Sequence, residues 1–232
     1  MNVIVIGNGF MGQVLYKELV NVGHSVMIVP DLNRPPLDCN FDVLIDFSHP
    51  EGLESIVNFC LMNNVPAVFA TTGYTETQFN QINDLALKIP VVYSGNYSLG
   101  VILMERLVRE AARVLGSDFD IEIIEKHHHH KIDAPSGTAK MLLKAANDQL
   151  GYNVIYGREG ECKRGEKEIA VHTIRGGSIV GEHEVLFAGA DELLTIKHEA
   201  LSKVIFAKGA IKAASWLLSK EVGLYNMEDV LF

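Results

Sequence analysis

The chain has few cysteines, no long apolar run and no excess of positive charge, and each absence excludes a class of protein. Its three cysteines, Cys39, Cys60 and Cys162, show no CxxC spacing, which argues against a disulfide framework and against a zinc site. The N-terminus lacks the basic start and apolar stretch of a signal peptide, and no run is long enough to span a membrane. A formal net charge of −9 disfavours nucleic acid and acidic membranes as partners. We therefore expect a cytoplasmic protein with neither partner.

The first hundred residues alternate short β-branched runs with helix-like stretches. We expect strands at residues 3–6, 25–29, 42–46, 66–71 and 90–94, and helices at 11–22, 50–63 and 76–88. Strands that are apolar along their whole length belong to parallel sheets that are covered by helices on both faces. The pattern therefore predicts an α/β fold with a Rossmann-like, doubly wound parallel sheet.

After residue 97 the pattern changes. A long helix at 98–115, a strand at 119–125 and a helix from about 136 come first, and a charged, glycine-containing loop at 158–167 follows. Three strand-like runs at 169–175, 183–188 and 193–198 favour a mixed sheet, and a helix at 206–218 would return to the first domain. We predict a dinucleotide-binding domain made of residues 1–97 and 208–232, with an inserted α+β domain at 98–207.

A glycine motif follows the first predicted strand and begins the first predicted helix. Its residues, Gly7-Asn8-Gly9-Phe10-Met11-Gly12, fit the GxGxxG pattern that binds the pyrophosphate of a dinucleotide. Asp31 ends the second predicted strand, at the spacing expected for a carboxylate that holds the adenosine ribose. The motif could also be an ordinary glycine turn and Asp31 a solvated acid. The sequence context favours the nucleotide site.

Two further segments follow predicted strands at the edge where ligands bind in such sheets. One contains Ala70, Thr71 and Thr72, and the other contains Ser94, Gly95, Asn96 and Tyr97. Both provide small residues, backbone groups and hydroxyls that suit a nicotinamide ring, although the same residue types also form plain turns. Asp46-Phe47-Ser48 ends the third strand and gives a weaker indication.

The most informative segment is the run of residues 127–138, HHHHKIDAPSGT. It places up to five positively chargeable side chains next to a predicted helix start, where unpaired backbone N–H groups bind anions. We expect Pro135 in the first helical turn, with the hydroxyls of Ser136 and Thr138 beside it. Lys131 and one histidine could handle protons near neutral pH. The segment therefore predicts a catalytic site for a substrate with carboxylate groups.

Three other interpretations of the histidine run compete with this one. A purification tag is disfavoured because the run lies inside the chain, between a predicted strand and a predicted helix. A metal-binding tract is disfavoured because adjacent histidines on an extended segment point to alternate sides and no Cys or carboxylate nearby completes a ligand set. A solvated loop remains the third alternative. We assign no metal.

Taken in order, these motifs resemble the 4-hydroxy-tetrahydrodipicolinate reductase (dihydrodipicolinate reductase) family of lysine and diaminopimelate biosynthesis. The resemblance extends over almost the whole chain, through GNGFMG, DFS, ATTG, SGNYSLGV, EKHHHHKIDAPSGTA and IRGGSIVGEHEV. The family signature HHxxKxDAPSGT is its most specific part. The compact glycine motif, in which many members carry one more residue, is a departure that puts contacts inside this loop in doubt.

The resemblance implies roles for individual residues. It implies that His127 and Lys131 are the acid/base residues, and that the substrate's two carboxylates are held by His128, Lys131, Ser136, Gly137 and Thr138. The nicotinamide nucleotide would be lined by Gly7, Asn8, Gly9, Phe10, Met11, Gly12, Asp31, Ala70, Thr71, Thr72, Ser94, Gly95, Asn96 and Tyr97. His129 and His130 lie at variable positions of the signature and receive no role. Arg175 is expected either near the pocket or as a stabiliser of a hairpin.

The resemblance also implies NADH or NADPH as cofactor, a small dicarboxylate as substrate and a homotetramer built through the middle domain. Asp31 suits NADH, whereas Arg34 could neutralise the 2′-phosphate of NADPH, so we expect use of both nucleotides. Two other functions compete with this one. Another dehydrogenase of a small carboxylate would not need the APSGT segment, and a non-catalytic nucleotide sensor would not need a proton-handling pair.

Overall fold

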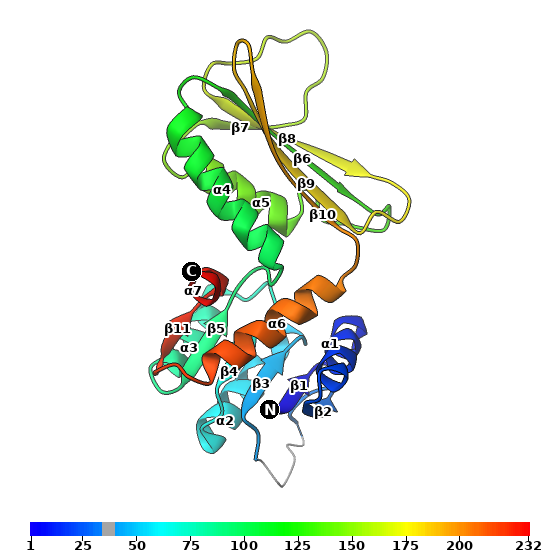
Figure 1. The fold of residues 1–232 in the computed structure, drawn as a ribbon, viewed down its shortest axis with the longest axis vertical. Coiled ribbons are helices and arrows are strands. Elements are labelled where there is room, and N and C mark those ends of the chain that lie inside the picture. Colours follow the sequence, from blue (N-terminus) through cyan, green and yellow to red (C-terminus); the bar gives the residue numbers. More distant parts are fainter. Residues whose placement is uncertain (34–39) are drawn as a thin grey trace. The chain divides into compact units, whose positions relative to one another are not determined.

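The computed structural model describes residues 1–33 and 40–232, so Arg34 lies outside the described residues. The chain forms two compact units (Figure 1). The first contains Met1–Leu99 and Lys203–Phe232, and the second contains Gly100–Ser202. The return to the first unit therefore comes before the last helix that the sequence predicts, and not within it at residue 208.

The first unit is built on a six-stranded parallel sheet with the order β11-β5-β4-β3-β1-β2. Its strands are β1 (Asn2–Ile6), β2 (Ser25–Val29), β3 (Val43–Asp46), β4 (Ala67–Phe69), β5 (Pro90–Tyr93) and β11 (Gly223–Tyr225). The central strands β3 and β4 are buried at every residue, which explains their continuous apolar runs. The predicted Rossmann-like sheet is confirmed, and β11 is an addition that the sequence did not suggest.

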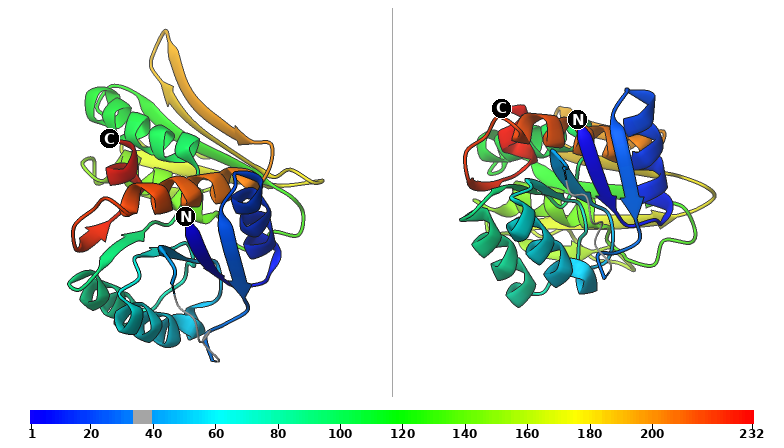
Figure 2. Two further views of the ribbon diagram at one scale, coloured as in Figure 1. Left: turned by 60° about the horizontal axis from the view of Figure 1, so that its bottom comes forward. Right: turned by 90° about the horizontal axis from the view of Figure 1, so that it is seen from below.

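Helices cover both faces of this sheet, as the views in Figure 2 show. Helix α1 (Phe10–Asn21) packs beside α6 (Val204–Leu217), which lies on β3, β4 and β5. Helix α2 (Leu53–Asn63) packs beside α3 (Glu76–Ala86). The single helix predicted at 50–63 is in fact a short 3₁₀ turn, η1 (Pro50–Gly52), followed by α2. A short helix, α7 (Met227–Leu231), was not predicted.

The second unit contains a five-stranded mixed sheet with the order β10-β9-β6-β8-β7. Its strands are β6 (Asp120–His127), β7 (Asn153–Tyr156), β8 (Glu168–Arg175), β9 (Gly181–Ala188) and β10 (Leu193–Ala200). Strand β6 pairs in parallel with β8 and antiparallel with β9. The predicted mixed sheet is confirmed, although β7 was missed. Strand β6 also continues two residues beyond the predicted end, which places His127 on the sheet.

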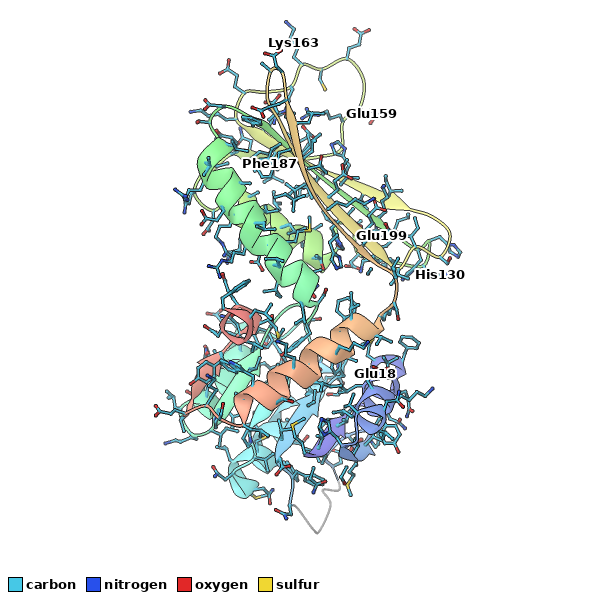
Figure 3. All side chains as sticks on the ribbon, in the orientation of Figure 1. Glu18, His130, Glu159, Lys163, Phe187 and Glu199 are labelled. Atoms are coloured by element: carbon cyan, nitrogen blue, oxygen red, sulfur yellow. The ribbon has the colours of Figure 1, made fainter. Side chains whose placement is uncertain are left out.

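Helices α4 (Leu99–Leu115) and α5 (Gly137–Asn147) form the core of this unit with one face of the sheet (Figure 1). Alternation along β6 directs Ile121 and Ile123 into that core, and Phe187 of β9, labelled in Figure 3, joins them. The same alternation buries the next two residues of the series, Glu125 and His127. Two ionisable side chains therefore continue an apolar stripe.

Among the described residues, we find no helix that is both long and apolar enough to cross a membrane.

Candidate active site

The glycine motif forms a tight connection between β1 and α1. Gly7 follows the last residue of β1 and adopts a φ of +101°, a backbone conformation that L-residues with side chains rarely adopt. Gly9 is the N-cap residue of α1 and is exposed. A methyl group at Gly12 would collide with the carbonyl oxygen of Gly7, so the loop and the first turn of the helix touch through backbone alone. The free N–H groups at this helix start suit a pyrophosphate.

A cavity of about 460 Å³ lies beside the end of β2. Asp31 lines it and is exposed, and its carboxylate accepts a hydrogen bond of 2.9 Å from the backbone N–H of Asn33. This position is the one that the sequence predicts for a ribose-binding acid. Arg34, which the sequence offers as a partner for a 2′-phosphate, is not among the described residues.

A second cavity, of about 650 Å³, lies at the ends of β3 and β4. Met11, Ala70, Thr71 and Thr72 line it, so the structure brings the glycine motif and the segment after β4 to one cavity. Residues 47–49 also line it, and Ser48 and His49 line the first cavity as well. The sequence signal for Phe47 and Ser48 was the DFS segment at the end of the third predicted strand, which gave only a weak indication.

Asp46, the last residue of β3, links the segments that line this cavity through hydrogen bonds. Its buried carboxylate accepts hydrogen bonds from the backbone N–H of Ser48 at 3.0 Å and from the hydroxyl of Tyr74 at 3.0 Å. Burial raises the pKa of the Asp46 carboxyl, and the hydrogen bonds from its neighbours oppose that rise. The same Ser48 N–H lies 2.9 Å from the hydroxyl oxygen of Thr71, so the segments after β3 and β4 are joined.

The segment after β5, which the sequence predicts to contact a nicotinamide ring, turns two of its side chains into the protein. Tyr97 is buried, and its hydroxyl donates to the backbone oxygen of Phe69 at 2.8 Å. The side chain of Asn96 is also buried and accepts a hydrogen bond from the backbone N–H of Ser98. Ser94 donates to the backbone oxygen of Asn96, and Gly95 is exposed. Tyr97 therefore supports the strand ends, and this segment offers a ligand mainly backbone and small side chains.

In the second unit, the helix start predicted after the histidine run is present. Ser136 is the N-cap residue of α5, and its hydroxyl oxygen accepts a hydrogen bond from the backbone N–H of Ala139 at 3.1 Å. Gly137 is exposed and Thr138 is half-buried, so the first turn is open to a ligand. Pro135 precedes the N-cap and does not lie in the first turn. That expectation was wrong because the serine ends the extended segment.

Glu125 is the centre of a buried hydrogen-bond network. Arg175 binds both of its carboxylate oxygens, with 2.8 Å from each terminal nitrogen. The first oxygen, Oε1, also accepts from the backbone N–H of Ser136 at 3.0 Å, and the second, Oε2, lies 2.5 Å from Nδ1 of His127. The Glu125 side chain is fully buried, whereas that of Arg175 is 18% exposed. One carboxylate thus links β6, β8 and the start of α5.

The network fixes the charge of its members. Burial would raise the pKa of Glu125, but hydrogen bonds from Arg175, His127 and Ser136 outweigh it and hold the pKa below its usual value. Burial lowers the pKa of His127, a shift that Glu125 opposes and that Lys131 and Arg175 reinforce. At neutral pH, Glu125 is therefore ionised and His127 is neutral.

Lys131 lies just outside this network. Its ammonium is 2.8 Å from the carboxylate of Asp133, and its side chain is 22% exposed. Arg175 donates to the backbone oxygens of both Lys131 and Asp133, at 3.3 and 2.6 Å. Figure 3 shows His130 in the connection after β6, at the end of the sheet. His128 is half-buried, whereas His129 and His130 are exposed.

His183 of β9 is a member of the site that the sequence analysis did not assign. Its Nε2 lies 2.9 Å from the hydroxyl oxygen of Ser136, and its ring stacks edge-on against His127 at 5.1 Å. Burial, with the nearby His127, lowers its pKa to about 4. Gly181, the first residue of β9, lies against His127. A methyl group at Gly181 would be 3.1 Å from Nε2 of the His127 ring. The only sequence signal was the GEHEV segment within the second family motif.

Glu125, His127 and His183 bring one potential metal ligand each to within 4.8 Å of one another. The argument that no carboxylate lies near the histidine run is therefore wrong. Both oxygens of Glu125 nevertheless accept hydrogen bonds already, and the guanidinium of Arg175 faces them. A cation beside that guanidinium would meet like charge. We assign no metal to this group.

His183→Gln should make the protein less sensitive to mild acid. The pKa of His183 is lower in the folded protein than its ordinary value of 6.5, so the unfolded chain takes up a proton first as the pH falls from about 6.5 towards 4. The wild type therefore loses up to about 2 kcal/mol of unfolding free energy through this group between pH 7 and pH 5.

Urea unfolding of wild type and His183→Gln at these two pH values measures the difference. The variant should lose less stability between them, and His129→Gln, an exposed control, should behave as wild type. An equal loss in wild type and His183→Gln would contradict the assignment of a buried, neutral His183.

Comparison with known proteins gives one consistent family. The model described as "Dihydrodipicolinate reductase, N-terminus" matches residues 23–97, and the model described as "Dihydrodipicolinate reductase, C-terminus" matches residues 100–231. The second match alone covers more than half of the chain. It includes the whole histidine run and every residue of the Glu125 network.

Relatives and solved structures agree with these models. A 4-hydroxy-tetrahydrodipicolinate reductase of Clostridium novyi is 46% identical over 201 residues, covering 86% of this chain and 80% of that protein. The enzyme of the same name from Brachyspira hyodysenteriae is 42% identical and is covered completely, as is this chain. The structure of dipicolinate-bound dihydrodipicolinate reductase from Paenisporosarcina sp. TG-14 matches with a TM-score of 0.81 at 25% identity, over all of both chains.

Proposed function

The chain belongs to the dihydrodipicolinate reductase family, and we propose how its residues carry out the reaction of that family. The protein is an NAD(P)H-dependent oxidoreductase that reduces 4-hydroxy-tetrahydrodipicolinate to tetrahydrodipicolinate in lysine and diaminopimelate biosynthesis. The nucleotide supplies the hydride, and the protein supplies position, charge and a proton.

The first unit would hold NADH or NADPH along the ends of its parallel strands. The N–H groups at the start of α1, between Gly7 and Gly12, suit the pyrophosphate, and Asp31 suits the adenosine ribose. Ala70, Thr71 and Thr72 line the neighbouring cavity, where the nicotinamide half would lie. Asn8, Phe10 and Met11 belong to the glycine motif and would line the nucleotide with it. The segment from Ser94 to Tyr97 would contribute backbone groups to the binding of the nicotinamide half.

The second unit would hold the substrate and donate the proton. The observations that support this most directly are the exposed Gly137 in the first turn of α5 and the ammonium of Lys131, which contacts Asp133 in the segment before this helix. The N–H groups of a first helical turn bind carboxylates, and an ammonium in the same site adds charge and a transferable proton. His128 would complete the carboxylate contacts. Ser136, whose N–H donates to Glu125 and whose hydroxyl contacts Ala139 and His183, would act by fixing the start of the helix as its N-cap. His127 would share the acid/base work with Lys131.

The proposed reaction is tested by making the substrate in place. Dihydrodipicolinate synthase with pyruvate and aspartate semialdehyde supplies it, and the loss of nicotinamide absorbance at 340 nm then reports reduction, run separately with NADH and NADPH. Pyridine-2,6-dicarboxylate, a planar mimic with two carboxylates, should compete with the substrate and not with the nucleotide. Oxidation of NADH with pyruvate alone, without the synthase, would instead indicate a dehydrogenase of another small carboxylate.

A homotetramer assembled through the second unit is part of the proposal. Strands β8 and β9 turn their apolar residues Val171, Val185 and Phe187 into the core of the unit, so these residues are not available to a partner. Other apolar side chains of this unit stay exposed, namely Tyr156, Ile174, Leu193 and Leu194. Exposed apolar side chains lose contact with water when subunits associate, which favours association. Light scattering should give four times the chain mass of 25.6 kDa, and a monomer at micromolar concentration would contradict it.

A further inference from the structure

Glu125 directly connects the proposed acid/base residue His127 to the helix start proposed to bind carboxylates. Its Oε2 contacts Nδ1 of His127, and its Oε1 contacts the backbone N–H of Ser136. His127 is the last residue of β6, whereas Ser136 precedes α5, so the contacts join two elements that a nine-residue segment separates in sequence. Lys131 belongs to that segment.

All the groups around the carboxylate are donors. Arg175 donates one N–H to each oxygen, and the Ser136 backbone donates another to Oε1. An ionised carboxylate only accepts hydrogen bonds, so the atom of His127 that lies 2.5 Å away must also carry a hydrogen. In a neutral imidazole, a hydrogen on Nδ1 leaves the lone pair on Nε2.

We propose that Glu125 is a positioning residue, which holds His127 as the Nδ1–H tautomer and so presents Nε2 as a hydrogen-bond and proton acceptor. Arg175 is the second positioning residue of this unit. Its two-pronged contact fixes the orientation of the Glu125 carboxylate, and its bonds to the backbone oxygens of Lys131 and Asp133 fix the segment that carries the ammonium.

This arrangement divides the proton chemistry between the two residues, and that division rests on the proposed function. In the free enzyme, Nε2 of His127 has no proton to give, whereas Lys131 has one. His127 therefore accepts a hydrogen bond or a proton in the site, and the proton delivered to the substrate comes from Lys131. The side chain of His127 is 11% exposed, so only a small part of the ring is open to a ligand.

The substitution Glu125→Gln should reverse the tautomer. If the new amide nitrogen took the place of Oε1, it would face two fixed donors, the Ser136 N–H and Arg175. In the place of Oε2 it faces Arg175 and His127, and the imidazole can become an acceptor by moving its proton to Nε2. The second orientation is therefore preferred, and His127 should change from the Nδ1–H to the Nε2–H form.

Nitrogen-15 chemical shifts of the imidazole measure the tautomer without any need for turnover. At about pH 7.5, wild type should show a protonated Nδ1 and an unprotonated Nε2 for His127, and Glu125→Gln the opposite. In the coupled assay the variant should lose about 10- to 100-fold in kcat/KM, as for other residues that orient a functional histidine, with an unchanged Kd for NADH. In a His127→Ala background, the same substitution should cost little more, because Glu125 acts through the imidazole.

Glu122→Gln is the matched control. Glu122 is also a glutamate of β6 and contacts a histidine, His172, at 2.7 Å, but on the other face of the strand. It should leave the nitrogen shifts of His127 and kcat/KM as in wild type.

Two results would overturn the proposal: an Nε2–H tautomer of His127 in wild type, or an unchanged tautomer in folded Glu125→Gln. The wild-type spectrum decides it even if the variant does not fold. A wild type with the Nδ1–H form but no reductase activity would contradict the proposed function and leave this tautomer assignment standing.

Discussion

Replacing Lys131 by alanine should lower kcat by about 10²- to 10⁴-fold, the usual cost of losing a general acid. The ammonium contacts the carboxylate of Asp133, and Arg175 binds the backbone oxygen of Lys131 and so holds the segment in place. His127 cannot replace it, because the Glu125 carboxylate keeps the proton of that neutral ring on Nδ1. The affinity for NADH, whose proposed site lies in the first unit, should stay within about twofold of wild type.

Lys131→Arg separates charge from proton transfer. Arginine keeps the positive charge for the substrate's carboxylate but does not give up a proton at neutral pH. We therefore expect kcat to fall as it does in Lys131→Ala, with KM closer to wild type. Lys140→Ala, an exposed lysine of α5, is the matched control and should retain wild-type rates. Near-normal turnover of Lys131→Arg would remove the lysine from proton transfer, although not from substrate binding.

The second large effect concerns two glycines of one motif, which should fail in different ways when replaced by alanine. A methyl group at Gly12 would collide with the carbonyl oxygen of Gly7 and separate the loop from the first turn of α1. We expect Gly12→Ala to lose at least about 1–3 kcal/mol of unfolding free energy. Its affinity for NADH should fall about 100-fold, because displacing two N–H donors from the pyrophosphate costs about 1.5 kcal/mol each.

Gly9→Ala should lose the nucleotide without losing the fold. Its φ of −74° is open to alanine, and no protein atom lies within 4 Å of the added methyl group. The methyl group would point into space that the pyrophosphate needs, so affinity should fall while the urea midpoint stays at the wild-type value. Gly176→Ala, which also meets no atom within 4 Å and belongs to the second unit, is the control for both measurements. Wild-type affinity in Gly9→Ala would place the pyrophosphate elsewhere.

The sequence by itself predicted most elements of the first unit, all but β11 and α7, and the segments in which we propose that the site lies. Buried parallel strands are apolar along their whole length, and a glycine motif needs a strand before it and a helix after it, so both signals are local. The start of α5 was also predicted to within about one residue, although Ser136 is its N-cap and Pro135 lies before it. Strands β7 and β11 were not predicted because each is short and neither is fully buried, so the hydrophobic pattern of their sequences is weak.

Only the tertiary structure decided which charges meet inside the second unit. The parallel pairing of β6 with β8 sets His127 opposite Arg175, and this register brings the guanidinium to Glu125 across 50 residues of sequence. Strand β9 brings His183 to Ser136 across 47 residues. In sequence, Glu125 was simply an acid at the end of a strand. Burial of a carboxylate requires a partner that supplies charge and hydrogen bonds. No local pattern specifies such a partner, because strand pairing alone determines which distant residue provides it.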